Sequence, residues 1–173
     1  KILLIGCGHM GGALINSWIA VNKYSITVVD PIKYKSLKKK YDNKIQVSKN
    51  LSSLKIIEKF DFIVFAVKPK NLKDVLEEFS NKKLKNQTII ISVIAGKKIN
   101  IFQNKFKNIK NIFRVMPNMP ALIGESMNCI ISNTAASKVV KRNVIKLFSY
   151  SGKTLLLKNE DQIDRATAIS GSG

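Results

Sequence analysis

The stretch KILLIGCGHMGG, residues 1–12, decides the fold that this sequence predicts. Its first five residues are mostly apolar and indicate a buried strand, and apolar residues at helical spacing follow from Gly12 onward. Between them, Gly6, Gly8 and Gly11 have the GxGxxG spacing of a loop that binds a dinucleotide pyrophosphate. The first glycine permits a tight turn, the second lets the backbone approach the phosphates, and the third lets helix and strand pack closely. The following helix would direct its N-terminal N–H groups toward the phosphates.

A second predicted strand, residues 25–30, ends on Asp30, which lies 19 residues after Gly11. A carboxylate at this place would accept hydrogen bonds from the ribose hydroxyls of NAD and would repel the 2′-phosphate of NADP. Lys33 and Lys35 follow, and they can neutralise such a phosphate. Asp30 also precedes a proline, and Asp-Pro is typical of turns. A cofactor role and a turn role for Asp30 both stay open, as does the choice between NADPH and NADH.

The rest of the chain alternates between strand and helix patterns. Further strands are predicted over residues 44–48, 61–67, 87–95, 111–117, 126–133 and 152–158. Helices are predicted over residues 12–21, 33–41, 52–59, 71–79, 99–106 and 136–151, with Asn50 or Ser52 capping the third and Asn71 the fourth, and one more begins in the last fourteen residues. This order predicts an α/β fold, a Rossmann-type doubly wound sheet that is mostly parallel and carries helices on both faces.

The net charge of +19 invites a nucleic-acid interpretation. Only three of the 30 basic residues are arginines, namely Arg114, Arg142 and Arg165, whereas base and phosphate recognition favours arginine. The lysines are scattered, and aromatic residues are not interleaved with them as a stacking surface would require. We therefore expect no nucleic-acid partner, although a basic surface attracts ligands that carry phosphate.

Other classes of protein are also disfavoured. The two cysteines, Cys7 and Cys129, lie far apart without metal-ligand spacing, so we expect neither a disulfide scaffold nor a metal site. No apolar run approaches the roughly 20 residues that span a bilayer, and the chain does not begin with a secretory leader. We expect a cytoplasmic protein without a membrane partner. His9, the only histidine, has no carboxylate nearby in sequence to orient it, so we expect contact with the cofactor rather than proton transfer.

Five stretches, taken together, resemble pyrroline-5-carboxylate reductase. They are IGCGHMG (5–11), FAVKP (65–69), ISVIAG (91–96), RVMPNMPALIGES (114–126) and DRATAISGSG (164–173), and they stand in the order of that family. The family reduces the cyclic imine pyrroline-5-carboxylate to L-proline with NADPH or NADH, in the last step of proline synthesis. Its fold is an N-terminal Rossmann domain followed by a helical domain that makes an interlocked dimer.

The resemblance implies a set of binding residues and no catalytic side chain. Cofactor contacts are expected at Gly6, Gly8, His9, Met10, Gly11, Asn50, Ala66, Val67, Lys68, Pro69, Val93, Ile94 and Ala95. Asn118, with Met116 and Pro117, is expected to form a wall beside the nicotinamide and the substrate, and Ser170, Gly171 and Ser172 are expected to hold the substrate carboxylate. Three extra residues separate Asn50 from the fourth strand relative to the family.

The resemblance also implies the domain organisation. Residues 1–158 are expected to form the dinucleotide-binding domain, and residues 159–173 to begin a helical domain whose remainder is missing. The full-length protein would then be a homodimer or a higher homo-oligomer, and the present chain alone would be inactive.

Three other functions stay open at this point. One is another Rossmann dehydrogenase, of the 6-phosphogluconate type, against which the motifs MPNMPA and SGSG argue. A second is a non-catalytic remnant that still binds cofactor, which the missing helical domain keeps open. The third is a basic module for nucleic acid, whose binding would fall steeply with salt.

Overall fold

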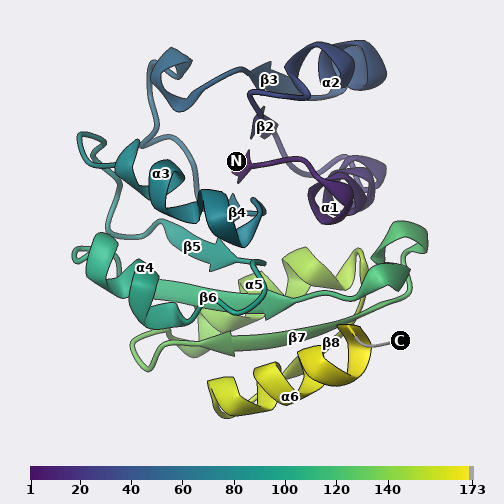
Figure 1. The fold of residues 1–173 in the computed structure, drawn as a ribbon, viewed down its shortest axis with the longest axis vertical. Helices are drawn as coiled ribbons and strands as arrows, with labels where there is room; N and C mark the ends of the chain where they lie inside the picture. The colour runs from purple at the N-terminus through teal and green to yellow at the C-terminus, as the bar shows by residue number, and fades with distance from the viewer. Residues whose placement is uncertain (172–173) are drawn as a thin grey trace.

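The computed structural model describes the backbone of residues 1–171 and the side chains of residues 1–168, and it contains one eight-stranded sheet (Figure 1). The strands are β1 (Ile2–Ile5), β2 (Ile26–Val29), β3 (Gln46–Ser48), β4 (Phe62–Phe65), β5 (Ile89–Ser92), β6 (Asn111–Met116), β7 (Ser126–Ser132) and β8 (Gly152–Leu156). The helices are α1 (His9–Ala20), α2 (Tyr34–Tyr41), α3 (Leu72–Glu77), α4 (Ile99–Lys105), α5 (Lys138–Ser149) and α6 (Glu160–Gly171). Short 3₁₀ turns are η1 (Asp42–Lys44), η2 (Leu51–Ser53), η3 (Pro69–Asn71) and η4 (Met119–Ile123).

The strand order is β3-β2-β1-β4-β5-β6-β7-β8. The first six strands in chain order run parallel to one another, β7 runs antiparallel to β6, and β8 runs parallel to β7. The predicted doubly wound, mostly parallel sheet is therefore confirmed. The central strands read as continuous apolar runs because both of their faces are covered; all four residues of β1 are buried.

Helices cover both faces of the sheet (Figure 1). Helices α1, α2 and α5 pack into one apolar core, and α3, α4 and α6 pack into the other. Trp18 on α1 joins two helices of the first face, because its indole Nε1 donates to the carbonyl of Leu147 at 3.0 Å and its ring meets Phe148 edge to face. A buried indole N–H generally needs such a partner.

Two local predictions are wrong. Residues 52–59 form no α-helix; the segment has only the short turn η2, which Asn50 caps by accepting from the backbone N–H of Ser53. Isolated short helices are marginal, and here Leu51 and Ile57 are buried individually without one. Asn71 makes no cap hydrogen bond, because it already has helical dihedrals at the end of η3.

Helix α1 begins at His9, three residues before the predicted start, so that Gly11 and Gly12 lie inside it. Within residues 1–171, no helix is both long enough and apolar enough to cross a membrane.

Candidate functional site

The carboxyl ends of four strands meet at one edge of the sheet. In the strand register, Ile5 of β1 lies beside Phe65 of β4, Phe65 beside Ser92 of β5, and Ser92 beside Arg114 of β6. The segments that follow these strands therefore leave the sheet side by side. The chain passes to opposite faces after β1 and β4, since α1 and α3 belong to different cores. Such a switch point is where doubly wound sheets bind ligands.

The glycine loop between β1 and α1 is packed so tightly that two of its glycines admit no side chain. Gly6 has a φ of +88°, and a Cβ there would lie 2.8 Å from a methyl of Val67 and 2.9 Å from the carbonyl of Ala66. A Cβ on Gly11 would lie 2.6 Å from the carbonyl oxygen of Gly6. A Cβ on Gly8 would meet nothing within 4 Å. Gly6 and Gly11 thus join the loop to the sheet, while Gly8 presents backbone to open space, as a loop that receives a phosphate requires.

Helix α1 presents an unneutralised N-terminus beside this loop. Its N-cap is Gly8, which provides no side-chain cap, and its first turn contains no acidic residue. The positive end of the helix dipole is therefore available for an anion. His9 is exposed, and Met10 is half-buried against the same core as Ala66.

Asp30 is buried and holds the glycine loop to the end of β2. Its Oδ2 accepts from the backbone N–H of Cys7 at 2.8 Å, and its Oδ1 accepts from those of Ile32 at 3.0 Å and Lys33 at 2.8 Å. The turn role of Asp30 is confirmed, and its contact with a cofactor stays a prediction. Burial, with a smaller contribution from the Asp30 charge, raises the pKa of the Cys7 thiol to about 11, so Cys7 stays protonated at neutral pH.

A cavity of about 430 Å³ lies at the β2–β3 end of the sheet. Its lining residues are Thr27, Tyr34, Gln46, Val47, Ser48, Lys49, Ser53 and Leu54. It adjoins Asp30, whose backbone N–H donates to the carbonyl of Ser48. Sequence reasoning missed this cavity because its walls come from separate segments that share no motif. Asn50 lies next to it in sequence, and its side-chain oxygen accepts hydrogen bonds from Ser52 and Ser53.

The residues predicted after β4 and β5 differ in how much they can touch a ligand. Lys68 and Pro69 are exposed, and Pro69 holds Lys68 in an extended conformation with φ −63° and ψ 145°. Ala66 and Val67 are half-buried, and Ala95 is exposed. Val93 and Ile94 are buried in opposite cores, so ordinary packing accounts for their side chains.

Asn118 shapes the turn after β6. Its Oδ1 accepts from the backbone N–H of Met127 at 2.9 Å and from the hydroxyl of Ser126 at 3.1 Å. The turn is thereby fixed to the start of β7. A cavity of about 100 Å³ lies here, lined by Met116, Asn118, Met127, Cys129 and Ala166 of α6. The structure thus brings the predicted wall beside the helix that leads to the predicted carboxylate site.

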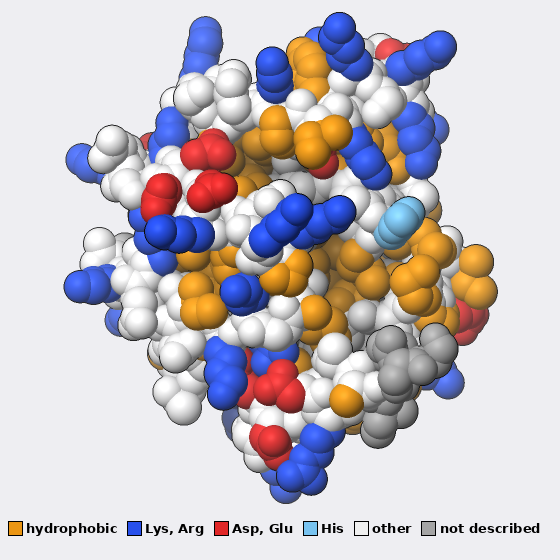
Figure 2. Space-filling view, in the orientation of Figure 1, with side chains coloured by type: hydrophobic (Ala, Val, Ile, Leu, Met, Phe, Trp, Pro, Cys, Tyr) orange, Lys and Arg blue, Asp and Glu red, His pale blue; other side chains and the backbone are white. Residues whose placement is uncertain are grey.

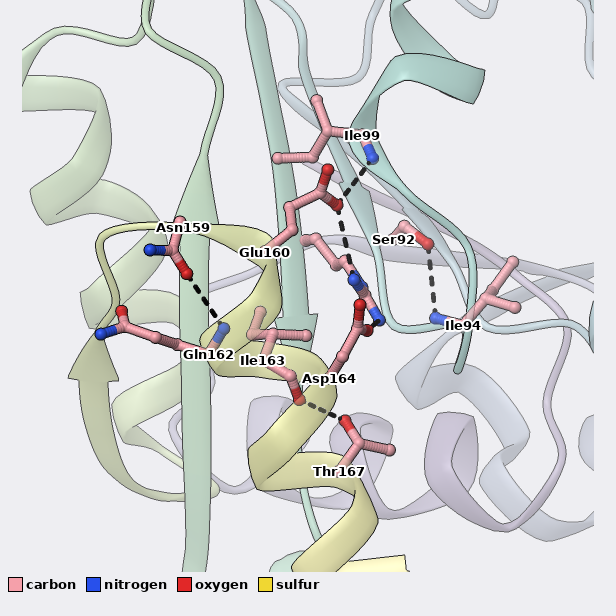
Figure 3. Close-up of polar contacts among 10 residues, drawn as sticks. Ser92, Ile94, Ile99, Asn159, Glu160, Gln162, Ile163, Asp164 and Thr167 are labelled. Carbon is pink, nitrogen blue, oxygen red and sulfur yellow. Dashed lines mark hydrogen bonds and ion pairs between the residues drawn. The ribbon is translucent and has the colours of Figure 1, made fainter.

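The predicted carboxylate-binding residues lie at the end of α6 or beyond. Ser170 and Gly171 belong to the last turn of that helix, and Ser172 lies outside the described residues. The start of α6 is tied to the sheet by polar contacts (Figure 3). Arg114 of β6 is fully buried and pairs with Glu160 and Asp164 of α6.

Arg114 carries a signal in the sequence that it needs a carboxylate partner, although the sequence does not pair it with particular acids. It stands in an otherwise apolar strand, NIFRVM, and the acids Glu160 and Asp164 follow at helical i, i+4 spacing. A buried arginine of this kind requires carboxylate partners.

Apolar and charged side chains are unevenly distributed over the face that carries these features (Figure 2). Apolar side chains gather in its middle and on the right, with lysines above them and the charged residues of α6 below. Among the exposed apolar residues, Met119, Leu122 and Ile123 belong to η4, which packs against α1. Among residues 1–171, no three His, Cys, Asp or Glu side chains are grouped to hold a metal ion.

Comparisons with known proteins agree with this geometry. A family model described as NADP oxidoreductase, coenzyme F420-dependent, matches residues 1–96, which is more than half of the chain. The chain is 35% identical over 122 residues to pyrroline-5-carboxylate reductase of Arabidopsis thaliana, covering 70% of this chain and 43% of that protein. It is 28% identical over 176 residues to the enzyme of that name from Methanosarcina acetivorans, covering 100% of this chain and 64% of the relative.

Solved structures extend the comparison. The crystal structure of Plasmodium falciparum pyrroline carboxylate reductase with NADP bound matches with a TM-score of 0.78 and 28% identity, covering 100% of this chain and 63% of that one. The chain therefore spans less than two thirds of the length of each of these relatives. The chain belongs to the NADP oxidoreductase family described above, and the resemblance to pyrroline-5-carboxylate reductase that its motifs indicate is confirmed over its whole length.

Proposed function

We propose that this chain forms the cofactor-binding part, and a portion of the substrate site, of an enzyme that reduces 1-pyrroline-5-carboxylate to L-proline with NADPH or NADH. The observation that carries the proposal is the match of the whole chain to proteins named as such reductases. The geometry supports it, because every motif behind the resemblance that lies in the described residues adjoins the carboxyl ends of the strands or belongs to α6.

The glycine loop and the start of α1 fit a dinucleotide. Gly8 leaves open space above the loop, and the N-terminus of α1 has no acidic residue in its first turn. In the proposed complex these groups hold the pyrophosphate, with His9 beside it. The cavity at the β2–β3 end provides room for the adenosine half, next to Asp30, Lys49 and Asn50. Ala66, Val67, Lys68, Pro69, Val93, Ile94 and Ala95 would border the nicotinamide half.

The proposed reaction needs orientation more than acid–base chemistry from side chains. The bound dinucleotide supplies a hydride to the imine carbon, which accepts it more readily when the imine nitrogen is protonated. The protein aligns the donor and acceptor carbons and holds the substrate carboxylate. Asn118 would form the wall beside the ring, and Ser170, Gly171 and Ser172 would bind the carboxylate through small side chains and backbone N–H groups.

The organisation of the whole protein is part of the proposal. Residues 1–158 would be the dinucleotide-binding domain, and residues 159–173 would begin a helical domain. The whole protein would act as a cytoplasmic homodimer or higher homo-oligomer on a small-molecule substrate. Because the chain spans under two thirds of its relatives, we expect these 173 residues alone to form no proline. Proline formation by the isolated chain would contradict that expectation.

Titration of the chain with NADH and NADPH tests cofactor binding, with the fluorescence of Trp18 as the signal. Trp18 is the only tryptophan and lies on the helix that follows the glycine loop. We expect saturable quenching by at least one dinucleotide, and weaker binding after Gly8→Val, whose side chain would fill the open space over the loop. Asn22→Gly, in the turn after α1, is the control, because glycine tolerates the φ of +47° found there. Absence of binding by both dinucleotides would contradict the proposal, whereas a preference would identify the cofactor.

A further inference from the structure

A single buried cation connects the two sides of the proposed substrate site. Arg114 lies in the middle of β6, and its side chain is 1% exposed. Its Nη2 is 2.7 Å from Oδ1 of Asp164, and its Nη1 is 3.4 Å from Oε1 of Glu160. Both acids belong to α6, the helix that leads to Ser170 and Gly171.

We propose that Arg114 is a positioning residue for the substrate site, because it fixes α6 against the end of β6. This inference rests on the proposed reductase function. Arg114 does not itself grip the substrate, since its guanidinium is buried and both of its terminal nitrogens face carboxylates of this chain. It acts through the helix that it holds.

The contacts of Glu160 extend this connection to a third element. The same Oε1 that faces Arg114 also accepts from the backbone N–H of Ile99, the first residue of α4, at 3.0 Å (Figure 3). Ile163, which lies between the two acids on α6, is fully buried in the core below α4. The first turn of α6 is therefore fixed to β6 and α4 at once, by charge on one side and by apolar packing on the other.

The small cavity of the proposed substrate site lies one turn further along. Met116 follows Arg114 by two residues in β6, so both side chains are on the same face of the sheet. Met116 and Asn118 line that cavity on one side, and Ala166 of α6 lines it as well. The separation of β6 and α6, which the ion pairs set, therefore sets the width of the cavity.

The chemistry of the cluster favours positioning over stability as its purpose. Burying an arginine is costly, and replacing a buried ion pair by apolar side chains is often neutral or stabilising. Here the Nε of Arg114 has no hydrogen-bond partner within the described residues, so the cluster is not optimised for stability. The cluster instead fixes the position of α6, because a guanidinium that faces two carboxylates holds the helix in one register against β6.

The test compares the buried Arg114 of β6 with Arg165, an arginine on the exposed surface of α6. Arg114→Met and Arg114→Lys are made in the whole protein as proposed above, and Arg165→Met is the control. Arg165 pairs with Asp161 on the exposed surface of the same helix at 2.9 Å, with exposed fractions of 78% and 67%. Steady-state reductase assays then give KM for pyrroline-5-carboxylate and kcat, and the fluorescence titration gives Kd for the dinucleotide.

We expect Arg114→Met to raise KM for the imine about tenfold or more, since a small displacement of binding groups is costly. Arg114→Lys is expected to lie between that variant and the unmodified protein. Kd for the dinucleotide is expected to stay within about twofold, and Arg165→Met to change none of these values. Hydrogen exchange of the α6 amides is expected to accelerate in Arg114→Met only.

The outcomes separate the two proposals. An unmodified full-length protein without reductase activity contradicts the proposed function, and this inference with it. An active protein in which Arg114→Met and Arg165→Met have the same KM overturns the positioning role alone. Increases of equal size in KM for the imine and in Kd for the dinucleotide would also overturn it, because they indicate a general structural effect. If Arg114→Met fails to fold, Asp164→Asn replaces it, with a smaller increase in KM expected and an unchanged KM contradicting the inference.

Discussion

The part of the molecule that ends with β5 and the part that begins with β6 are held together in different ways. Through residue 92, the strands pack between the apolar faces of helices, and only Ile32 and Ile56 are large apolar residues left exposed. From residue 111 to residue 168, where the described side chains end, buried polar groups form connected networks, and seven large apolar residues are exposed. These are Met119, Leu122, Ile123, Met127, Val139, Leu155 and Leu156.

The difference teaches that the two parts are suited to different tasks. The first part is ordered mainly by apolar packing, to which Asp30 adds the hydrogen bonds that hold the glycine loop. The second part takes its order from directional contacts, among them those of Arg114 and Asn128, and leaves apolar surface uncovered. Apolar surface of this extent marks sites of interaction, which suits the part proposed to complete a substrate site.

The largest effect is expected in the glycine loop of the first part. Gly11→Ala would place a methyl 2.6 Å from the carbonyl oxygen of Gly6, and since backbone must move, we expect a loss of about 2–4 kcal/mol in unfolding free energy. Gly12→Ala is the matched control, because its methyl meets nothing within 4 Å, and a gain of up to about 1 kcal/mol is expected from helix propensity. Urea unfolding followed by Trp18 fluorescence measures both. Equal stabilities of the two variants would contradict the packing assignment.

A smaller loss is expected from the polar network of the second part. Asn128 is fully buried; its Nδ2 donates to the carbonyls of Phe148 and Lys153, and its Oδ1 accepts from Ser126. Asn128→Ala removes these three buried hydrogen bonds, so we expect a loss of about 2–3 kcal/mol in unfolding free energy, with the thermal midpoint lowered accordingly. Met127→Ala, at the exposed neighbouring position, is expected to change stability by under about 0.5 kcal/mol. A loss no larger than that of the control would mean that packing, not hydrogen bonding, orders β7.

The smallest effect concerns the pH dependence of the first part. Burial raises the pKa of the Cys7 thiol from its ordinary value of 9.0 to about 11, so folding favours the protonated thiol. The unfolded chain loses this proton first, and the contribution of Cys7 to stability is therefore full below pH 9 and falls as the pH rises toward 11. Urea unfolding at pH 8 and at pH 10.5, for the protein and for Cys7→Ala, isolates this contribution from the titration of the lysines. A difference between the two proteins that is the same at both pH values would contradict it.

Local pattern predicts the strands of both parts, and what it misses depends on contacts between distant segments. Strands β1, β4 and β5 are apolar runs bounded by glycine, proline or polar residues, so local pattern suffices for them. The GxGxxG spacing places the loop because its constraint is steric and local. The prediction of a helix over residues 52–59 fails because the tertiary fold buries the apolar residues of this segment without one.

The residues of the site likewise fall into those that local pattern predicts and those that only the tertiary structure reveals. The segments after β1, β4, β5 and β6 are predicted to meet because parallel strands end at a common edge. The Arg114 cluster joins residues 46 and 50 positions apart, and no local pattern measures such a contact. Asp30 was ambiguous because one carboxylate can serve both a turn and a ligand, and only its three backbone hydrogen bonds establish the first role.

The position of β1 in the middle of the sheet has a consequence during protein synthesis. Its partner β2 follows closely, but its other partner β4 comes later, since Ile2 lies beside Phe62. A ribosome that adds about 5–20 residues per second needs roughly 3–12 s to make the intervening chain. Throughout that time one edge of β1 has no partner, and the glycine loop lacks Ala66 and Val67, against which Gly6 packs. The nascent chain is therefore most exposed to aggregation, and most in need of a chaperone, before β4 emerges.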